Sequence, residues 1–170
     1  MPGSTRLWHG ARLDGTAAEV RGGRSAMMGM TSDEVLEFNR SVIAEFRDND
    51  GVMPAGSLFH GNPTMLVTMI GRRSGRELTS PLSYATDGDG WIIMASAGGS
   101  ETTPAWAFNL RANPAVTVEL LGERFRATAA ETAGDERARV FDLMITQLPR
   151  FADYQAAVSR RIPLFRLTRD

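Results

Sequence analysis

The chain has 170 residues and a mass of 18.5 kDa, enough for one globular domain and too little for two. Its 19 basic residues are all arginine and balance 20 acidic ones, which leaves a formal net charge of -1 and excludes a general field for nucleic acid or anionic lipid. It has no cysteine and two histidines, which excludes disulfides, thiolate metal sites and cysteine nucleophiles and predicts no metal centre.

Residues 1–30 differ in composition from the rest of the chain. They are rich in Gly, Arg and Ala and lack apolar periodicity, so we expect a disordered tail followed by a single domain over residues 31–170. Translation beginning at Met27, Met28 or Met30 would remove most of this tail. No hydrophobic core of a signal peptide and no apolar run of about 20 residues is present, which predicts a cytoplasmic protein without an integral membrane segment.

A helix is predicted to begin after Thr31 and to end near residues 48–51. Thr31 and Glu34 have the spacing of a capping box, and apolar residues recur at helical period from Val35 to Phe46. The polar face carries both acids and arginines, whereas an anionic membrane would favour a basic face. We therefore favour burial of this helix against the rest of the domain over binding to a membrane surface or closure over a substrate.

The rest of the chain alternates short strand patterns with turn signals. The predicted strands span residues 65–70, 78–84, 91–95, 116–121, 124–130 and 162–167. The predicted helices span residues 104–113, with Thr103 as N-cap and Pro104 at the first helical position, 135–147 and 151–160. Hairpin signals such as Asp87-Gly88-Asp89-Gly90 join most strands, and helical crossovers do not. This predicts a mainly β, α+β fold: an antiparallel sheet or small barrel with helices packed outside.

The turn over residues 71–76 combines three arginines, a serine and two glycines between two predicted strands. Glycine lets backbone N–H groups converge on an anion, and arginine binds phosphate or carboxylate oxygens in bidentate fashion. The turn lacks the lysine and the following helix of a phosphate-binding P-loop. It is therefore a candidate anion site, with a solvated, charged hairpin turn as the alternative.

Three further features point to a site for a flat ligand. Residues 95–99 are small, so a ring can lie against their backbone, although a flexible loop would have the same composition. Trp106 and Asn109 share a helix face, where the alternative is a core tryptophan. Phe151 and Tyr154 are similarly spaced and either cover a pocket or pack on the sheet. No histidine accompanies Ser96 at a plausible spacing, which argues against a hydrolase, and His60 is interpreted as structural or solvent-facing.

The order of these motifs resembles that of the deazaflavin-dependent nitroreductase family of actinobacterial oxidoreductases, which use coenzyme F420. The resemblance runs from about residue 42 to residue 167. It rests on Gly-Arg-Arg-Ser-Gly, Pro81-Leu82, Asp-Gly-Asp-Gly, Ala-Ser-Ala-Gly-Gly, the segment Pro104–Pro114 and, near the end, Tyr154-Gln155 and Arg161-Ile162-Pro163. It implies an antiparallel split β-barrel of the FMN-binding-like type, in agreement with the strand pattern.

The resemblance also implies a coenzyme site. The residues that would hold or border the coenzyme are Leu66, Thr68, Arg72, Arg73, Ser74, Gly75, Arg76, Pro81, Leu82, Ser96, Ala97, Gly98, Trp106 and Asn109. In this interpretation the arginines hold the phosphate and oligoglutamate tail, and residues 96–98 donate backbone hydrogen bonds to the ring. Much of the family carries a lysine where this chain has Ala97, and tyrosines where it has Leu148 and Phe151. Tyr154 and Ser96 remain as candidate catalytic proton donors.

These features lead to three hypotheses for function. The first is an oxidoreductase that transfers a hydride from reduced coenzyme F420 to a small quinone, nitro or unsaturated compound. The second is a reductase of the same fold that binds FMN, and the third is a non-catalytic deazaflavin-binding protein. In each case the expected partner is a small molecule rather than nucleic acid, and the oligomeric state is open between a monomer and a homodimer.

Overall fold

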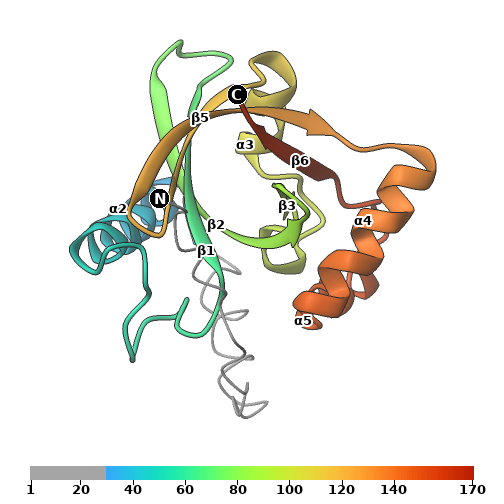
Figure 1. Ribbon diagram of the computed structural model, residues 1–170, viewed down its shortest axis with the longest axis horizontal. Coiled ribbons are helices and arrows are strands. Elements are labelled where there is room, and N and C mark those ends of the chain that lie inside the picture. Colours follow the sequence, from blue (N-terminus) through green and yellow to red (C-terminus); the bar gives the residue numbers. More distant parts are fainter. Residues whose placement is uncertain (1–29) are drawn as a thin grey trace, which may run out of the picture.

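Six antiparallel strands close into a barrel in this computed structural model, which describes residues 30–170 (Figure 1). The strands are β1 (Thr64–Ile70), β2 (Glu77–Asp87), β3 (Gly90–Met94), β4 (Ala115–Leu120), β5 (Glu123–Glu131) and β6 (Leu164–Arg169). They pair around the barrel in the order β1-β2-β3-β6-β5-β4, and β4 closes the ring on β1. The predicted antiparallel barrel is confirmed. The predicted N-terminal tail lies, apart from Met30, outside the described residues.

Strand β1 is covered on both faces, as its continuous apolar run predicts. Met65, Val67 and Met69 point into the barrel core, where side chains from all six strands meet. Leu66 points the other way, into a second apolar cluster beneath helix α2 (Ser32–Asp48). Six of the seven residues of β1 are buried, which makes this strand the rigid wall from which the turn at residues 71–76 projects.

Helix α2 packs on the outside of the barrel. Its capping box forms as predicted: the Thr31 hydroxyl accepts a hydrogen bond from the Glu34 amide at 3.3 Å, and the Glu34 carboxylate accepts one from the Thr31 amide. Val42 and Phe46 are buried in the cluster around Leu66, whereas Leu36, nearer the N-terminus of the helix, is 49% exposed. The predicted burial against the domain is therefore confirmed for the C-terminal half of the apolar face.

Helices α4 (Gly134–Gln147) and α5 (Arg150–Ala156) pack on another side of the barrel, against a cluster that includes Ile92 of β3 and Leu164 of β6 (Figure 1). The carboxylate of Asp87, in the β2–β3 hairpin, joins this layer through ion pairs of 2.9 Å with Arg139 and 3.0 Å with Arg166. Both predicted hairpins form, between β2 and β3 and between β4 and β5.

Two predicted helix boundaries are wrong. Helix α5 ends at Ala156 rather than at residue 160, because the Gln155 amide group bonds the Arg160 carbonyl and the Ile162 N–H and folds the chain back. Helix α3 (Ala105–Ala112) has Pro104 rather than Thr103 as its N-cap residue, since the Thr103 hydroxyl accepts a hydrogen bond from Arg160 instead. Both corrections involve Arg160, which contacts the loop before α3.

Candidate active site

A large groove opens on one side of the barrel, with a volume of about 1380 Å³. One wall is strand β2, and the others come from α2, the loop over residues 56–62, the small-residue loop (residues 95–99), the start of α3 and the residues from Leu148 to Tyr154. Figure 1 shows α2 and α5 on opposite sides of the space in front of β2. The site predicted around the small-residue loop, Trp106, Asn109 and Tyr154 is thus brought together in one place.

The groove is elongated along β2. Every residue from Glu77 to Ser83 lines it, including the predicted Pro81 and Leu82, and seven strand residues extend over roughly 20 Å. One end therefore begins directly after Arg76, and the other lies near Ser83 and α5. We call these the arginine end and the α5 end. A groove of this length accommodates an elongated ligand with chemically different ends.

The arginine turn (residues 71–76) has a tight backbone stabilised from within. The Gly71 N–H donates to the Arg76 carbonyl at 2.8 Å, the Gly75 N–H donates to the Gly71 carbonyl at 2.8 Å, and the Arg76 N–H donates to the Ser74 hydroxyl at 3.2 Å. A Cβ on Gly71 would lie 2.5 Å from the Ser74 oxygen, so this position requires glycine. Because these amides are already bonded, the turn offers an anion its guanidinium groups more than the predicted backbone nest.

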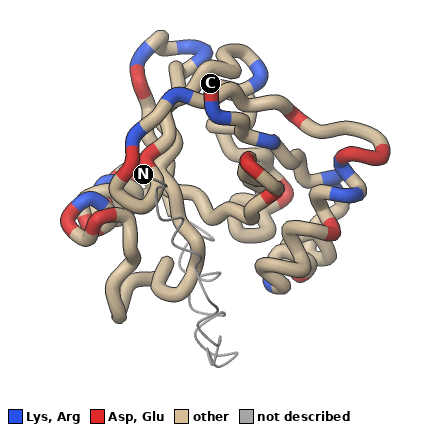
Figure 2. The backbone as a smooth tube through the Cα atoms, in the orientation of Figure 1, with Lys and Arg blue, Asp and Glu red and all other residues tan. Residues whose placement is uncertain are grey.

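The three guanidinium groups of the turn are available for a ligand. Within residues 30–170, Arg72, Arg73 and Arg76 form no ion pair with a carboxylate, and all three residues are exposed. Figure 2 shows this concentration of positive charge at the turn between β1 and β2. The Arg72 guanidinium lies 5.0 Å from the ring centroid of Phe108, which positions it over α3.

Leu66 and Thr68, the predicted coenzyme neighbours on β1, do not line the groove. Leu66 is fully buried beneath α2, and the Thr68 hydroxyl bonds the Thr79 hydroxyl at 2.8 Å. Among the described residues, Met69 is the β1 residue that lines the groove. The largely apolar sequence of β1 gave no signal of which residue would reach the groove.

The small-residue loop presents two amides to the groove. Ala97 and Gly98 have φ angles of 46° and 65°, in the left-handed region, within the short 3-10 helix η1 (Ala97–Gly99). The Ser96 N–H donates to the Met94 carbonyl at 2.8 Å, whereas the N–H groups of Ala97 and Gly98 bond no acceptor in the described part of the chain. A Cβ on Gly98 would meet nothing within 4 Å, so a ligand can approach this backbone closely.

Arg160 bonds the small-residue loop and is a candidate positioning residue that the sequence did not reveal. Its guanidinium donates to the carbonyl oxygens of Ala95 at 3.0 Å, Ser96 at 3.2 Å and Ser100 at 2.9 Å, and to the Thr103 hydroxyl at 3.2 Å. Burial lowers the pKa of this guanidinium from its ordinary value, and the nearby Glu101 opposes that effect. The order of the sequence motifs could not predict these contacts, because Arg160 is about 60 residues away from its partners in the chain.

Trp106 and Asn109 both line the groove from α3, as their shared helix face predicts. Trp106 is half-buried and packs on Phe165 of the core, with ring centroids 5.8 Å apart. Asn109 is buried, and its side-chain oxygen accepts a hydrogen bond of 3.0 Å from the Arg72 amide. Asn109 therefore connects the groove wall to the arginine turn and fixes where that turn lies.

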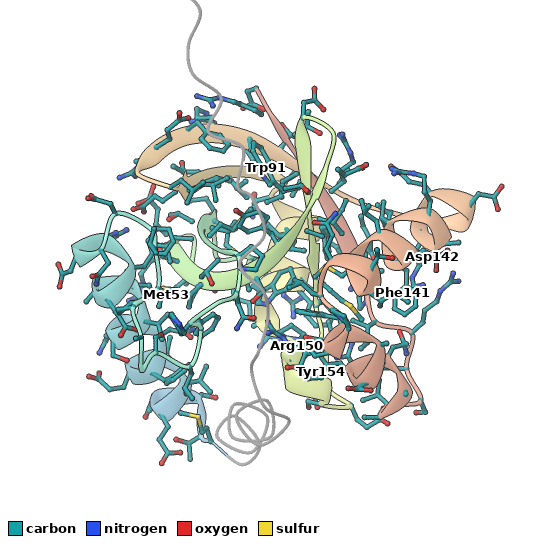
Figure 3. All side chains as sticks on the ribbon, turned by 60° about the horizontal axis from the view of Figure 1, so that its bottom comes forward. Met53, Trp91, Phe141, Asp142, Arg150 and Tyr154 are labelled. Atoms are coloured by element: carbon teal, nitrogen blue, oxygen red, sulfur yellow. The ribbon has the colours of Figure 1, made fainter. Side chains whose placement is uncertain are left out.

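The α5 end of the groove is mostly apolar around one guanidinium. Leu148 and Phe151 are buried, and Tyr154 packs edge-on against Phe151 with ring centroids 5.1 Å apart. Arg150 donates hydrogen bonds to the Asn62 side-chain oxygen and, at 3.1 Å, to the Ser83 hydroxyl. Figure 3 shows Arg150 and Tyr154 next to each other where α5 faces the barrel. Arg150 is the second functional candidate that the sequence did not reveal.

Comparison with known proteins assigns the family. The model of the F420H(2)-dependent quinone reductase family matches residues 38–169, which is nearly all of the barrel and its helices. The chain belongs to this family. Its members include the F420H(2)-dependent quinone reductase Rv1261c of Mycobacterium tuberculosis, which is 36% identical over 110 residues, covering 63% of this chain and 74% of that protein.

Two solved structures share the fold of this F420H(2)-dependent reductase. One is described as an F420-H2 dependent reductase, FDR-A, with 34% identity, a TM-score of 0.58 and coverage of 62% of this chain and 93% of that chain. The other is described as a domain-swapped dimer, with 29% identity, a TM-score of 0.60 and coverage of 81% and 99%. Among the described residues of our chain, no helix is both long and apolar enough to cross a membrane.

Coenzyme F420 is the cofactor of this family, the first of the two cofactors that the sequence left open. Arg72, Arg73 and Arg76 do not line the groove themselves; they lie on the turn just beyond the end that begins at Glu77. The surroundings fit such a group on three counts: unpaired arginines beyond one end of the groove, two unbonded amides in the small-residue loop, and a tryptophan in the groove lining. The chain is therefore an F420H2-dependent reductase.

Proposed function

We propose that this reductase transfers a hydride from reduced coenzyme F420 to a small electron-poor acceptor, with quinones as the principal class. The observation that supports this most directly is one groove of about 1380 Å³ that has the exposed arginine turn just beyond one end and aromatic side chains at the α5 end. An anionic coenzyme tail matches the first end, and a planar acceptor matches the second. When bound, the coenzyme supplies the hydride, and the protein positions the reactants and excludes water.

At the arginine end, we propose that Arg72, Arg73 and Arg76 bind the phosphate and the oligoglutamate tail. Bidentate guanidinium contacts to phosphate are charge-assisted and stronger than neutral hydrogen bonds. Ser74 and Gly75 keep the turn in the conformation that presents these groups, because Ser74 caps the Arg76 amide and Gly75 has a φ of 66°. Pro81 and Leu82 then border the coenzyme from β2.

In the middle of the groove, we propose that the amides of Ala97 and Gly98 donate to the deazaflavin ring. The ring would lie between this loop and Trp106. Asn109 would border the ring and, through its hydrogen bond from the Arg72 amide, hold the arginine turn in position. Leu66 and Thr68 do not line the groove. They would support the groove wall indirectly, Leu66 by packing beneath α2 and Thr68 through its hydrogen bond to Thr79 of β2. The proposed site thus keeps the predicted residues but gives those two an indirect role.

Reduction of a quinone to a hydroquinone requires a proton in addition to the hydride. We propose Tyr154 as the donor and Ser96 as the second candidate, because both line the groove beside the small-residue loop. A Cβ on Gly99 of that loop would lie 3.5 Å from Tyr154 Cδ1, so the tyrosine ring is within contact range of the loop to which we propose the coenzyme binds. Their hydroxyl groups are proton sources within the groove lining.

The functional unit that we propose is the domain over residues 31–170, because α2 contributes to one groove wall. The structure described as a domain-swapped dimer supports testing for a homodimer of this chain by light scattering.

Turnover of reduced F420 with a quinone, a nitroarene and an enone tests the proposal. We expect reduction of the quinone above the other two, and a Tyr154→Phe variant with kcat lowered by roughly 100-fold. Tyr84→Phe is the matched control, because Tyr84 is a buried core residue outside the groove and burial raises its pKa. A larger loss in Ser96→Ala than in Tyr154→Phe would move the donor role to Ser96. The absence of turnover with all three acceptors would contradict the proposal.

A further inference from the structure

Arg150 carries a positive charge that no described carboxylate compensates. The residue is half-buried in the groove lining, and its hydrogen-bond partners are neutral: the Asn62 amide oxygen and the Ser83 hydroxyl. Its guanidinium also lies 5.2 Å from the Phe151 ring centroid. Burial lowers the pKa of this arginine and the nearby Tyr154 hydroxyl opposes that effect, and a guanidinium stays charged at any physiological pH.

The acidic residues near this end do not neutralise Arg150. Asp153, one helical turn further along α5, is exposed and forms no ion pair with it in the described structure. Glu77 is the one acid among the described groove-lining residues, and it lies at the arginine end. Since Glu77 and Ser83 are six residues apart on β2, roughly 20 Å separates that acid from the Arg150 contact.

The guanidinium retains donors for a ligand. Arginine has five N–H groups, and the two hydrogen bonds to Asn62 and Ser83 use one on each terminal nitrogen. These two contacts fix the plane of the group and leave the other N–H groups to an incoming oxygen. A pre-oriented guanidinium with spare donors is the arrangement that binds a carboxylate in proteins.

We propose that Arg150 is an anion subsite for the acceptor, so that the enzyme prefers electron-poor aromatic or quinoid acceptors bearing a carboxylate. The ring of such an acceptor would lie against Leu148, Phe151 and Tyr154, and its carboxylate would pair with Arg150. This inference rests on the proposed function of the groove. The coenzyme is assigned to the opposite end, where the three arginines of the turn already match its anionic tail, so a separate anion is required at Arg150.

Two acceptors that differ in charge and by a single methyl group provide the test. The probes are a 1,4-naphthoquinone carrying a propanoate side chain and the methyl ester of the same compound. Their rings have the same reactivity, because the charge is insulated from the quinone by the side chain. We expect the wild-type protein to favour the acid over the ester by roughly 10- to 100-fold, both in kcat/KM with reduced F420 and in Kd from calorimetry.

Variants then assign the preference to Arg150. Arg150→Met should bring the acid-to-ester ratio to about one by weakening the acid alone, and Arg150→Lys should retain part of the preference. The control is Arg126→Met, which makes the same change in net charge at a side chain that is 74% exposed on β5, and the ratio should stay at the wild-type value. If Arg150→Met does not fold, Arg150→Lys carries the assignment, and a wild-type ratio near one still overturns the proposal.

The possible failures are distinguishable. Equal use of acid and ester by the wild-type protein would overturn the subsite while the reductase function stands. Preferential binding of the acid without turnover of either quinone would contradict the proposed function and support the subsite. An equal loss of both quinones in Arg150→Met would overturn the subsite, since the residue would then act on the fold or on the ring. So would a weakened Kd for F420 with an unchanged ratio, since Arg150 would then serve the coenzyme.

Discussion

Replacement of Arg160 by methionine should loosen the small-residue loop and weaken coenzyme binding together. Methionine keeps the apolar length of the arginine stem and removes all the donors. The four acceptors that lose a hydrogen bond are the carbonyl oxygens of Ala95, Ser96 and Ser100 and the Thr103 hydroxyl. Each belongs to the segment that carries the amides proposed to contact the ring.

The size of the effect follows from burial. Ala95 is fully buried and Ser96 is 7% exposed, so water has little access to their carbonyl oxygens, whereas Ser100 and Thr103 are only half-buried and can exchange their bond for one to solvent. A buried acceptor left without a partner costs about 1–3 kcal/mol. Two such acceptors predict a loss of about 2–6 kcal/mol in the free energy of unfolding.

Urea unfolding and a coenzyme titration measure the two consequences. We expect Arg160→Met to lower the urea midpoint without changing the slope, and to raise the Kd for F420 by roughly 10-fold because the loop amides lose their orientation. Arg160→Lys should recover part of the stability, because an ammonium group can bond one or two of the four acceptors. An unchanged midpoint together with an unchanged Kd would refute the reasoning.

Three further predictions concern other parts of the molecule. Hydrogen bonds from Arg139 and Arg166 lower the pKa of Asp87 from its ordinary 3.8 to about 2. The carboxylate therefore stabilises the fold above about pH 4, and this contribution is lost as the pH falls towards 2. Asp87→Asn should therefore lower the free energy of unfolding by about 1–2 kcal/mol at pH 7, and by much less at pH 2, in urea titrations. Ala97→Lys should tighten F420 binding by about 5- to 10-fold relative to Ala97→Met in fluorescence titrations, because the lysine adds a cation beside an anionic ligand. Gly71→Ala should weaken F420 binding by several-fold, because the new Cβ would lie 2.5 Å from the Ser74 hydroxyl oxygen and force that hydroxyl to move. The double variant Gly71→Ala with Ser74→Ala removes this clash and should regain much of the lost affinity.

The fold could be predicted from the sequence because its signals are local. The β1 run, the Asp87–Gly90 hairpin and the Thr31–Glu34 capping box each specify an element within a few residues, and each forms as predicted. The two wrong boundaries have different causes. The N-cap of α3 depends on the hydrogen bond between Thr103 and Arg160, which are 57 residues apart. The early end of α5 depends on the Gln155 side chain, which bonds backbone groups five and seven residues further along, and helical periodicity does not show such a contact.

The candidate site likewise contains residues that the sequence could predict and residues that it could not. Trp106 and Asn109 could be placed on one face from helical spacing, and the small-residue loop from its composition, and all of them line one groove. Arg160 and Arg150 gave no signal, because nothing in their neighbouring residues shows that one holds the small-residue loop and the other faces the groove. Leu66 and Thr68 could not be oriented, since a strand that is buried on both faces has no polar alternation to show which side meets the ligand.

Equilibrium titration of the purified protein with coenzyme F420 and with FMN, for the wild-type chain and for Arg72→Ala combined with Arg73→Ala, tests the central claim most directly. Loss of two charge-assisted contacts, each worth about 1.5–3 kcal/mol, predicts F420 affinity at least roughly 100-fold weaker in the double variant, with fluorescence quenching as the readout. The control is Arg126→Met, which removes a guanidinium from the exposed side of β5. Its affinity for F420 should equal that of the wild type. Tight F420 binding that depends on the arginine turn is the predicted result. Wild-type binding to FMN alone, or F420 binding that the double variant leaves unchanged, would contradict the account.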